Sequence, residues 1–509
     1  MSKRINWIVA IIAQQDGEHC FEYADLEYSI LSQPSFEHIK YKIFYWEQRS
    51  SVATIKETQY SQRFKANTFL NLKQPFIANI YDPTILTSFL QLVLLPDTAE
   101  VEYRYMVILW GHGVALGYLS QSTNDPDDPN HFDYFSLLKS PQFATLPAEK
   151  RSEYNKKLAH FSFLRAHLPV EYDPAEFLQK LFAKDGFTLS KDTIDDLTDA
   201  LRLITSLQLN TILEKALPSG KTVDVLIANS CYTQLFETGY ALRRSVKLLV
   251  SPETTIPFTG FNYPGLFSLL EATPSVGLPE IAENIRDRFR AKYNAEPFRS
   301  IFKVQRPVDF LALPEVSFSA NFLEYYQDLL DEVINPLAEK LTDMLNAHQG
   351  KLIEKVRNNC QDISWQPVFS MSPYGVIDFL HFLTEFVADR TQAGDKSWEP
   401  FLDKLQAAHK RICAAWLQAE DPGLYPPTRK TSAPYGLSIF FPSDGTDDTS
   451  AALFLQYNTT SKSVVSPQLD PWINFVWSYH IHISVFILNT PPAIPPLNTK
   501  PGPASGNPA

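Results

Sequence analysis

Two stretches of the sequence decide the fold: RYMVILWGHG at residues 104–113 and VDVLIANSC at residues 223–231. Each is an apolar run of strand length, and each is followed at once by a residue of reactive type, His112 in the first and Cys231 in the second. Short continuous apolar runs indicate strands that are buried on both faces, as in a parallel sheet. We therefore expect both residues to lie just beyond the ends of buried strands.

The chain around these two stretches alternates between strand-like and helix-like segments. Strands are predicted at Trp7–Ile12, Ile39–Trp46 and Leu248–Val250, and Asp82 followed by Pro83 predicts the start of a helix. Strands that alternate with helices indicate βαβ units, so an α/β fold with a mainly parallel central sheet is expected. Further helices are predicted at Glu22–Leu31, from Ser190 to Ile204, and at Phe322–Leu345 with a kink at Pro336.

At 509 residues the chain is longer than one hydrophobic core usually serves. We assign residues 1–320 to a catalytic α/β domain, residues 321–480 to a mostly helical domain with a late strand at 436–442, and residues 481–509 to a terminal strand and a Pro-rich disordered tail. Residues 120–188 interrupt the first domain, beginning with NDPDDPN at residues 124–130, and are interpreted as an inserted surface segment.

Composition excludes several classes of function. The formal net charge is −12 at pH 7, which disfavours nucleic acid and anionic membrane surfaces as partners, and no apolar stretch is long enough for a membrane-spanning helix. The four cysteines are scattered without CxxC spacing, which excludes a zinc ribbon and favours reduced thiols. Residues 5–13 are apolar but lack a signal-peptide cleavage site, so a buried strand and a cytoplasmic location are expected.

His112 and Cys231 together predict nucleophilic chemistry. Glycines flank His112 and leave space around it, and the carboxyl edge of a parallel sheet is where ligands bind. A helix-compatible run follows Cys231, and a thiol at a helix N-terminus is favoured as the thiolate. Each residue alone is equally compatible with a structural role, as a turn histidine or a buried cysteine. Their combination on two strand ends favours a Cys–His dyad.

These features resemble a known family of enzymes. A strand that ends in His-Gly, followed later by a strand that ends in x-x-Cys, is the signature of the cysteine peptidase clan that holds caspases, legumains, gingipains and clostripain. The chain resembles the clostripain family in particular, in four blocks that appear in the expected order. The blocks are MVILWGHG at 106–113, DVLIANSC at 224–231 with Glu237 and Tyr240 beyond it, SPETTIP at 251–257 with Gly260 and Tyr263, and YGLSIFFP at 435–442.

The resemblance implies a caspase-like α/β/α sandwich and roles for individual residues. His112 would be the general base and Cys231 the nucleophile, and the backbone N–H groups of Gly113 and Cys231 would form the oxyanion hole. Ser251 and Glu253, in the loop 251–255, would help to wall the pocket for the residue before the scissile bond. No metal and no cofactor are implied, although several relatives respond to calcium.

The sequence departs from the family pattern in two places. Relatives usually have an aspartate two residues before the cysteine, where it favours Arg or Lys in the substrate, and here that position is Asn229. The stretch between His112 and Cys231 is also longer than expected, and the excess lies in residues 120–188. Members of the clan often cut themselves in such a loop, so the insert is expected to hold a maturation site or to bind a regulator.

The resulting hypothesis is an intracellular cysteine endopeptidase that is regulated, as a zymogen, or self-processed. By analogy with caspase-like bacterial relatives, it would serve in cell death or defence and act on a pore-forming or toxin-like protein. The alternative is a catalytically silent scaffold that binds partners through the insert. A third, weaker interpretation is a secreted digestive protease, which requires residues 5–13 to be a signal peptide.

Overall fold

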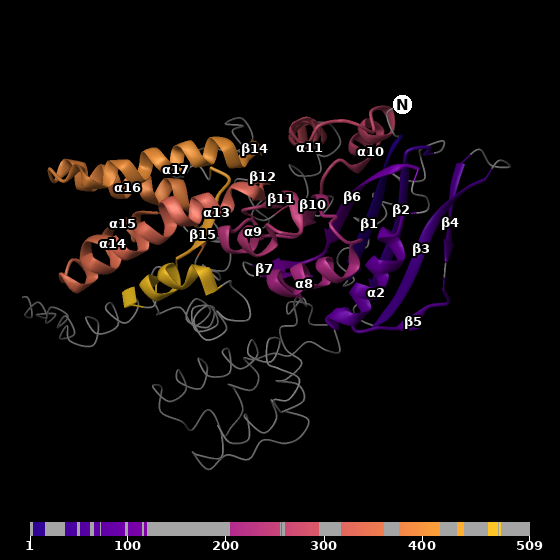
Figure 1. Ribbon diagram of the computed structural model, residues 1–509, viewed down its shortest axis with the longest axis horizontal. Coiled ribbons are helices and arrows are strands. Elements are labelled where there is room, and N and C mark those ends of the chain that lie inside the picture. The colour runs from indigo at the N-terminus through magenta and orange to yellow at the C-terminus, as the bar shows by residue number, and fades with distance from the viewer. Residues whose placement is uncertain are drawn as a thin grey trace, which may run out of the picture.

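The computed structural model describes residues 4–15, 36–47, 51–61, 66–71, 73–96, 100–114, 117–119, 204–254, 256, 260–294, 317–360, 376–417, 435–441, 467–476 and 478–479. A ten-stranded sheet runs through the molecule and carries helices on both faces (Figure 1). The α/β sandwich with a mainly parallel sheet is confirmed. The predicted helix at Glu22–Leu31, the insert at 120–188 and residues 481–509 lie outside the described residues.

The centre of the sheet is parallel and its two sides are antiparallel. Strands β2, β1, β6, β10 and β11 are parallel neighbours, whereas β12 and β14 on one side and β3, β4 and β5 on the other pair antiparallel. In spatial order the strands are β14 (Cys413–Leu417), β12 (Phe318–Phe322), β11 (Val246–Pro252), β10 (Val223–Asn229), β6 (Glu102–Trp110), β1 (Ile5–Gln15), β2 (Ile39–Glu47), β3 (Val52–Ser61) and β4 (Ala66–Asn71), with β5 (Phe76–Ile77) beside β3.

Alternate residues of each central strand enter opposite hydrophobic layers, because side chains alternate across a strand. In β1, Ile8 and Ile12 enter one layer and Val9 and Ile11 the other, and all four are buried. The Val9 layer packs against α10 (Tyr263–Ala272) and α11 (Leu278–Asn294). The Ile8 layer packs against α2 (Pro83–Leu94), α8 (Ser206–Ala216) and α9 (Phe236–Leu242).

The C-terminal helices continue the second of these layers and do not form a core of their own. The predicted boundary at residue 320 falls inside β12, and the late strand β14 returns to the same sheet beyond it. Figure 1 shows the long helices beyond the β14 end of the sheet. They are α14 (Asn335–Asn346), α15 (Gly350–Asn359), α16 (Phe379–Gln392) and α17 (Glu399–Ile412), and the short helix α13 (Tyr326–Leu329) precedes them. A small sheet of β13 (Val376–Asp378) and β15 (Ser438–Phe440) lies beside them.

Two helix predictions need correction. The segment at 323–346 is helical as predicted, but it contains a π turn at Leu330–Ile334 directly before Pro336. Proline lacks an N–H group and its ring crowds the preceding turn, and the wider turn accommodates it. The predicted helix from Ser190 to Ile204 lies outside the described residues except for Ile204, which belongs to a short strand. Helix α8 instead begins with a capping box in which Thr205 and Gln208 bond each other's backbone N–H groups at 3.1 and 3.0 Å.

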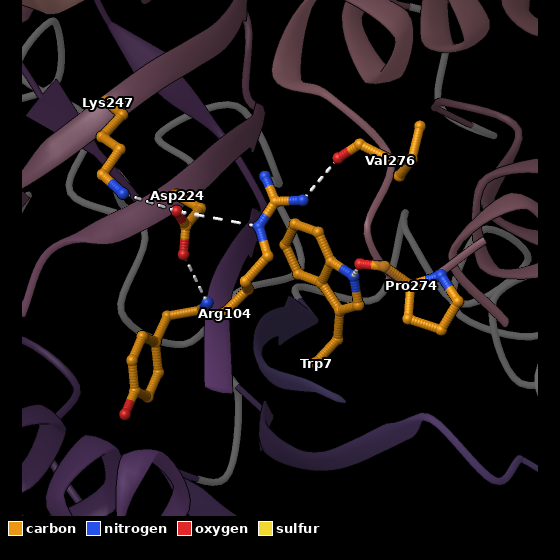
Figure 2. A network of polar contacts seen from close by, with 7 residues as sticks. Trp7, Arg104, Asp224, Lys247, Pro274 and Val276 are labelled. Atoms are coloured by element: carbon orange, nitrogen blue, oxygen red, sulfur yellow. Dashed lines mark hydrogen bonds and ion pairs between the residues drawn. The ribbon is translucent and has the colours of Figure 1, made fainter. Parts of the chain in front are cut away.

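A polar network ties the amino ends of the central strands together. The buried Asp224 of β10 accepts hydrogen bonds from the backbone N–H of Tyr105, at 2.9 Å, and from Lys247 Nζ, at 2.8 Å (Figure 2). Arg104 Nε lies 3.9 Å from the same carboxylate. Because β6 contributes Arg104 and Tyr105, β10 contributes Asp224 and β11 contributes Lys247, the network joins three neighbouring strands.

The same network reaches the helices on one face of the sheet. The guanidinium of Arg104 lies over the Trp7 ring, 4.3 Å from its centre, and donates to the carbonyl of Val276. Trp7 Nε1 donates to the carbonyl of Pro274 at 2.9 Å (Figure 2). Both carbonyls lie in the connection between α10 and α11, so these contacts attach that connection to the amino end of the sheet.

Candidate active site

The two predicted reactive residues lie at the opposite, carboxyl end of the sheet. Strands β6 and β10 are adjacent and parallel, and their last residues, Trp110 and Asn229, are register partners. The N–H of Gly111 donates to the carbonyl of Asn229 at 3.3 Å, which extends the pairing past the end of β6. His112 therefore follows one strand and Cys231 the next at the same edge, and both residues are half-buried.

Gly113 brings the histidine loop into direct contact with the cysteine loop. A Cβ atom at Gly113 would lie 2.6 Å from the carbonyl oxygen of Cys231, 2.7 Å from Ser230 Cβ and 2.8 Å from Thr233 Cγ2. No side chain fits in this space, so only glycine permits the approach. Gly113 also begins a small sheet made of β7 (Gly113–Val114), β8 (Gly117–Tyr118) and β9 (Ile204–Thr205).

Cys231 lies in a tight turn rather than at the start of a helix. Helix α9 begins only at Phe236, so the prediction that its dipole acts on the thiol is wrong. Tyr232 adopts a left-handed backbone conformation with φ 57°, and Thr233 Oγ1 donates to the Ser230 carbonyl at 2.8 Å. Such a conformation is strained for a residue with a side chain and persists only where its surroundings impose it.

The end of β11 and the residues that follow it run alongside this turn and hold it through backbone bonds. Pro252 and Thr254 offer their carbonyls to the N–H groups of Gln234 and Tyr232, at 2.9 and 3.1 Å. The N–H of Ile256 donates to Cys231 Sγ at 3.4 Å. A donor at this position stabilises negative charge on the sulfur. Pro252, Thr254 and Ile256 thus form one wall of the cysteine loop.

The side chains of Ser251 and Glu253 do not take the role that the resemblance implied. The buried Ser251 Oγ donates to Gln234 Oε1. Glu253 is 1% exposed and accepts hydrogen bonds from Ser317 and Gly436 and from Ser438. Both side chains are held in internal contacts, so the part of this segment that faces the cysteine loop is its backbone.

Asn229 is buried next to a glycine at the end of β10. It is 5% exposed, and a Cβ at Gly260 would lie 2.4 Å from Asn229 Oδ1. Gly260 has a φ of +55°, a conformation that also favours glycine. Among the described residues Asn229 Oδ1 has no hydrogen-bond donor. A buried acceptor without a donor is costly unless a further group supplies one.

The sequence did not indicate two residues of this site. Gln234 is fully buried, and its side chain joins Ser251 to the Tyr326 hydroxyl, which it approaches to 3.4 Å. Ile256 contributes only its backbone N–H to Cys231. Neither has a distinctive residue type or spacing, and only the position of neighbouring strands reveals their contacts.

The remaining cysteines have structural surroundings, and no metal site is evident. Cys360 is buried, and burial together with the carboxylates of Glu253 and Asp378 raises the pKa of Cys413 to about 12. Cys20 lies outside the described residues. Within the described part of the chain, no cluster of three or more His, Cys, Asp or Glu side chains could hold a metal ion, and none of the helices could cross a membrane.

Comparison with protein-family models gives a match to the clostripain family over residues 194–374. The chain carries a clostripain-family segment. This segment includes Asn229 and Cys231 in their strand and turn, whereas His112 lies before the matched range. The clostripain family consists of cysteine peptidases, so the chain is assigned to the cysteine endopeptidases and its substrates are proteins or peptides. A comparison with curated proteins gave no match.

Solved clostripain-family structures share the fold. A secreted C11 cysteine protease from Bacteroides thetaiotaomicron in complex with an irreversible peptide inhibitor is 12% identical, with a TM-score of 0.51 over 92% of this chain and 98% of that chain. The same type of protease from that organism, called iotapain, gives 12% identity and a TM-score of 0.49 over 94% and 99% of the two chains. An inactive zymogen C11 protease from Parabacteroides distasonis is 12% identical, with a TM-score of 0.47 over 92% of this chain and 99% of that chain.

Proposed function

We propose that this clostripain-family protein cleaves peptide bonds with Cys231 as the nucleophile and His112 as its acid–base partner. The observation that carries the proposal is the contact between the two loops, in which Gly113 lies directly against the carbonyl of Cys231. Adjacent parallel strands deliver both residues to one edge of the sheet. A histidine beside a thiol can accept its proton for the attack and return it to the leaving amine.

The same contact supports a backbone oxyanion hole. The tetrahedral intermediate of acyl transfer develops negative charge on the former carbonyl oxygen, and backbone N–H groups are suited to stabilise it. The N–H groups of Gly113 and Cys231 belong to the two loops that meet here, and neither group requires a side chain to move. We assign them this role.

The proposal is tested with a peptide that carries a thiol-reactive electrophile at the scissile position. We expect one covalent adduct, located at Cys231 by peptide mapping, that disappears in Cys231→Ala and is strongly slowed in His112→Ala. A silent scaffold would not discriminate between this peptide and a simple alkylating reagent. Labelling of Cys413 or Cys360 at the same rate as Cys231 would therefore contradict the proposal.

We expect Asn229 to make the enzyme accept a neutral residue before the scissile bond. Its buried side chain offers a single acceptor oxygen and carries no charge to pair with a guanidinium. A buried charge that loses its partner costs about 3–5 kcal/mol, or about two to three orders of magnitude in preference. Asn229→Asp should therefore shift kcat/KM toward Arg and Lys substrates by about a hundredfold relative to Leu.

The measurement compares peptides that differ only at this residue. Asn346→Asp, at an exposed position of α14, adds the same charge away from the site and should leave the preference unchanged. A wild-type enzyme that already prefers Arg or Lys over Leu a hundredfold would contradict the assignment.

We expect any self-cleavage to fall within residues 120–188. These residues lie outside the described part of the chain, but the described segments on either side of them are paired, Tyr118 with Ile204. A cut between these two strands would leave the sheet pairing intact. Mass spectrometry of the purified wild type should show fragments that end in this range and are absent from Cys231→Ala. Equal fragments from both proteins would point to a contaminating protease instead.

A further inference from the structure

A buried pair of carboxyl groups lies behind the wall of the cysteine loop. Glu253 is 1% exposed and Asp378 is 4% exposed, and their carboxyl groups bind the consecutive N–H groups of Gly436 and Tyr435, within hydrogen-bonding reach of each other. Two carboxylates in contact in a buried site cannot both be ionised, so the pair must share a proton. The peptidase chemistry proposed above does not use this proton.

Each acid also binds the segment 435–441 from a different side. Glu253 Oε2 accepts from the N–H of Gly436 at 2.9 Å, and its Oε1 accepts from Ser438 Oγ at 2.7 Å. Asp378 Oδ2 accepts from the N–H of Tyr435 at 2.5 Å, while its Oδ1 caps α16 through the N–H of His381 at 2.7 Å. The pair therefore joins the end of β11 to β13 and to the segment that contains β15.

Glu253 belongs to the wall itself and faces away from Cys231. The carbonyls of Pro252 and Thr254 and the N–H of Ile256 bond the cysteine loop, as described above. Between them, the N–H of Glu253 points the other way and donates to the Ser317 carbonyl at 2.9 Å. This alternation is that of an extended chain. A shift of the Glu253 carboxyl would be transmitted directly to the neighbouring peptide groups that hold Tyr232, Gln234 and the sulfur of Cys231.

Other titratable groups surround the pair on every packed element. They are Cys413 at the start of β14, Tyr326 on α13, Glu237 on α9, His381 on α16, His409 on α17 and, through Cys413, Arg286 on α11. Burial raises the pKa of Cys413 and Tyr326 and lowers the pKa of His381 and His409, so these four groups favour their neutral forms. Glu237 on α9 accepts a hydrogen bond from the N–H of Phe440 and so also holds the segment 435–441.

We propose that Glu253 and Asp378 form a proton-dependent clamp that positions the Cys231 loop by fixing the segment from Pro252 to Thr254 against residues 435–441. While the shared proton is present, a hydrogen bond joins the two carboxyl groups and the wall stays in place. When the proton leaves, two buried carboxylates repel each other and the wall loosens. The positioning role rests on the dyad proposed above, but the clamp itself is a property of the fold.

The sign of the pH dependence follows from linkage. Burial, opposed by hydrogen bonds from Ser317 and Ser438, raises the pKa of Glu253 to about 7, and burial together with the nearby Glu253 carboxylate raises the pKa of Asp378. When the wall opens, Glu253 meets water and returns to an ordinary pKa of about 4.3. The closed form thus binds the proton more tightly. The free energy by which proton binding favours the closed form is largest below about pH 4, falls as pH rises, and is lost above about pH 7.

Hydrogen exchange of the wall tests this on the full chain. We expect the opening constant of the amides of Tyr232 and Gln234, relative to that of Glu253→Gln, to rise about tenfold per pH unit between pH 5 and 7 and to level off above. The variant amide keeps the contact with Asp378 without a dissociable proton. Amides of α2, remote from the pair, should show no such change.

A further control distinguishes the effect of the shared proton from the effect of losing a hydrogen bond to Glu253. Ser438→Ala removes one hydrogen bond to Glu253 and keeps both acids, so it should open the wall more at every pH and retain the slope. Alkylation of Cys231 by iodoacetamide, again as a ratio to Glu253→Gln, should show a step in the same pH range if the clamp positions the nucleophile. An alkylation ratio without the step would overturn the positioning role.

The clamp is overturned if the ratio of the opening constants of the wild type and Glu253→Gln does not change with pH. Should Glu253→Gln fail to fold, the wild-type opening of the wall relative to α2 provides the same slope, and a flat result there overturns it equally. Neither readout requires turnover. A chain without peptidase activity would therefore refute the dyad while the exchange data still decide the clamp.

Discussion

Cys231→Ala and His112→Ala should each lower kcat/KM for a peptide substrate by about four orders of magnitude or more. Removal of the thiol eliminates the nucleophile, and removal of the imidazole leaves the thiol without a base and the leaving amine without an acid. Because the two residues act as a unit, the double variant should be little worse than either single one. The loops that carry them pack through backbone and Gly113, so the fold should survive both changes.

The measurement is steady-state cleavage of a peptide substrate, with circular dichroism as a check of folding. Cys360→Ala is the matched control, because Cys360 is a buried cysteine at the end of α15. It should retain turnover with at most a loss of stability. Near-wild-type turnover in Cys231→Ala would show that the nucleophile has been assigned incorrectly.

Gly113→Ala should lower kcat/KM by about a hundredfold or more without unfolding the chain. The added methyl would lie 2.6 Å from the carbonyl oxygen of Cys231, a backbone atom that cannot rotate away. The histidine loop would have to move outward relative to the cysteine loop, and a displacement of about 1 Å between reacting groups costs about a hundredfold in rate. The proposed oxyanion donor at Gly113 would move with it.

A second glycine provides the matched control for this substitution. A Cβ at Gly277 would meet only Pro279 Cδ, at 3.6 Å, which is an ordinary contact. Gly277→Ala should therefore leave kcat/KM unchanged. Kinetics and thermal melting of both variants, measured together, check the expectation. If Gly113→Ala retained full activity, the two loops could not be in the contact that carries the dyad.

Much of the fold could be predicted because its central strands are buried on both faces. The runs at Trp7–Ile12 and Ile39–Trp46 became β1 and β2, with somewhat longer bounds. The helix start at Asp82 was also correct, since the Asp82 carboxylate accepts the Thr84 N–H at 2.9 Å. Local sequence is sufficient where a segment contains both the apolar pattern of an element and the residues that mark its start or end.

The predictions failed where distant segments share a layer. Nothing near residue 320 marks the return of β14 to the sheet, and the division into two domains did not anticipate a core shared by both parts. The helix expected directly after Cys231 begins only at Phe236, because Pro252 and Thr254 supply the backbone bonds that hold a turn there. Tertiary hydrogen bonds overrode a local helical pattern in that case.

The sequence by itself determined which residues follow the central strands, because an apolar run and the polar residue after it are neighbours in the chain. His112 and Cys231 were found in this way. Only the tertiary structure decided what Glu253 does. Its carboxyl turns away from the cysteine loop and meets Asp378, a residue from a distant part of the chain, because β11, β12 and the segment 435–441 close around it. The direction of a buried side chain depends on the partners that fold against it, and no local pattern specifies them.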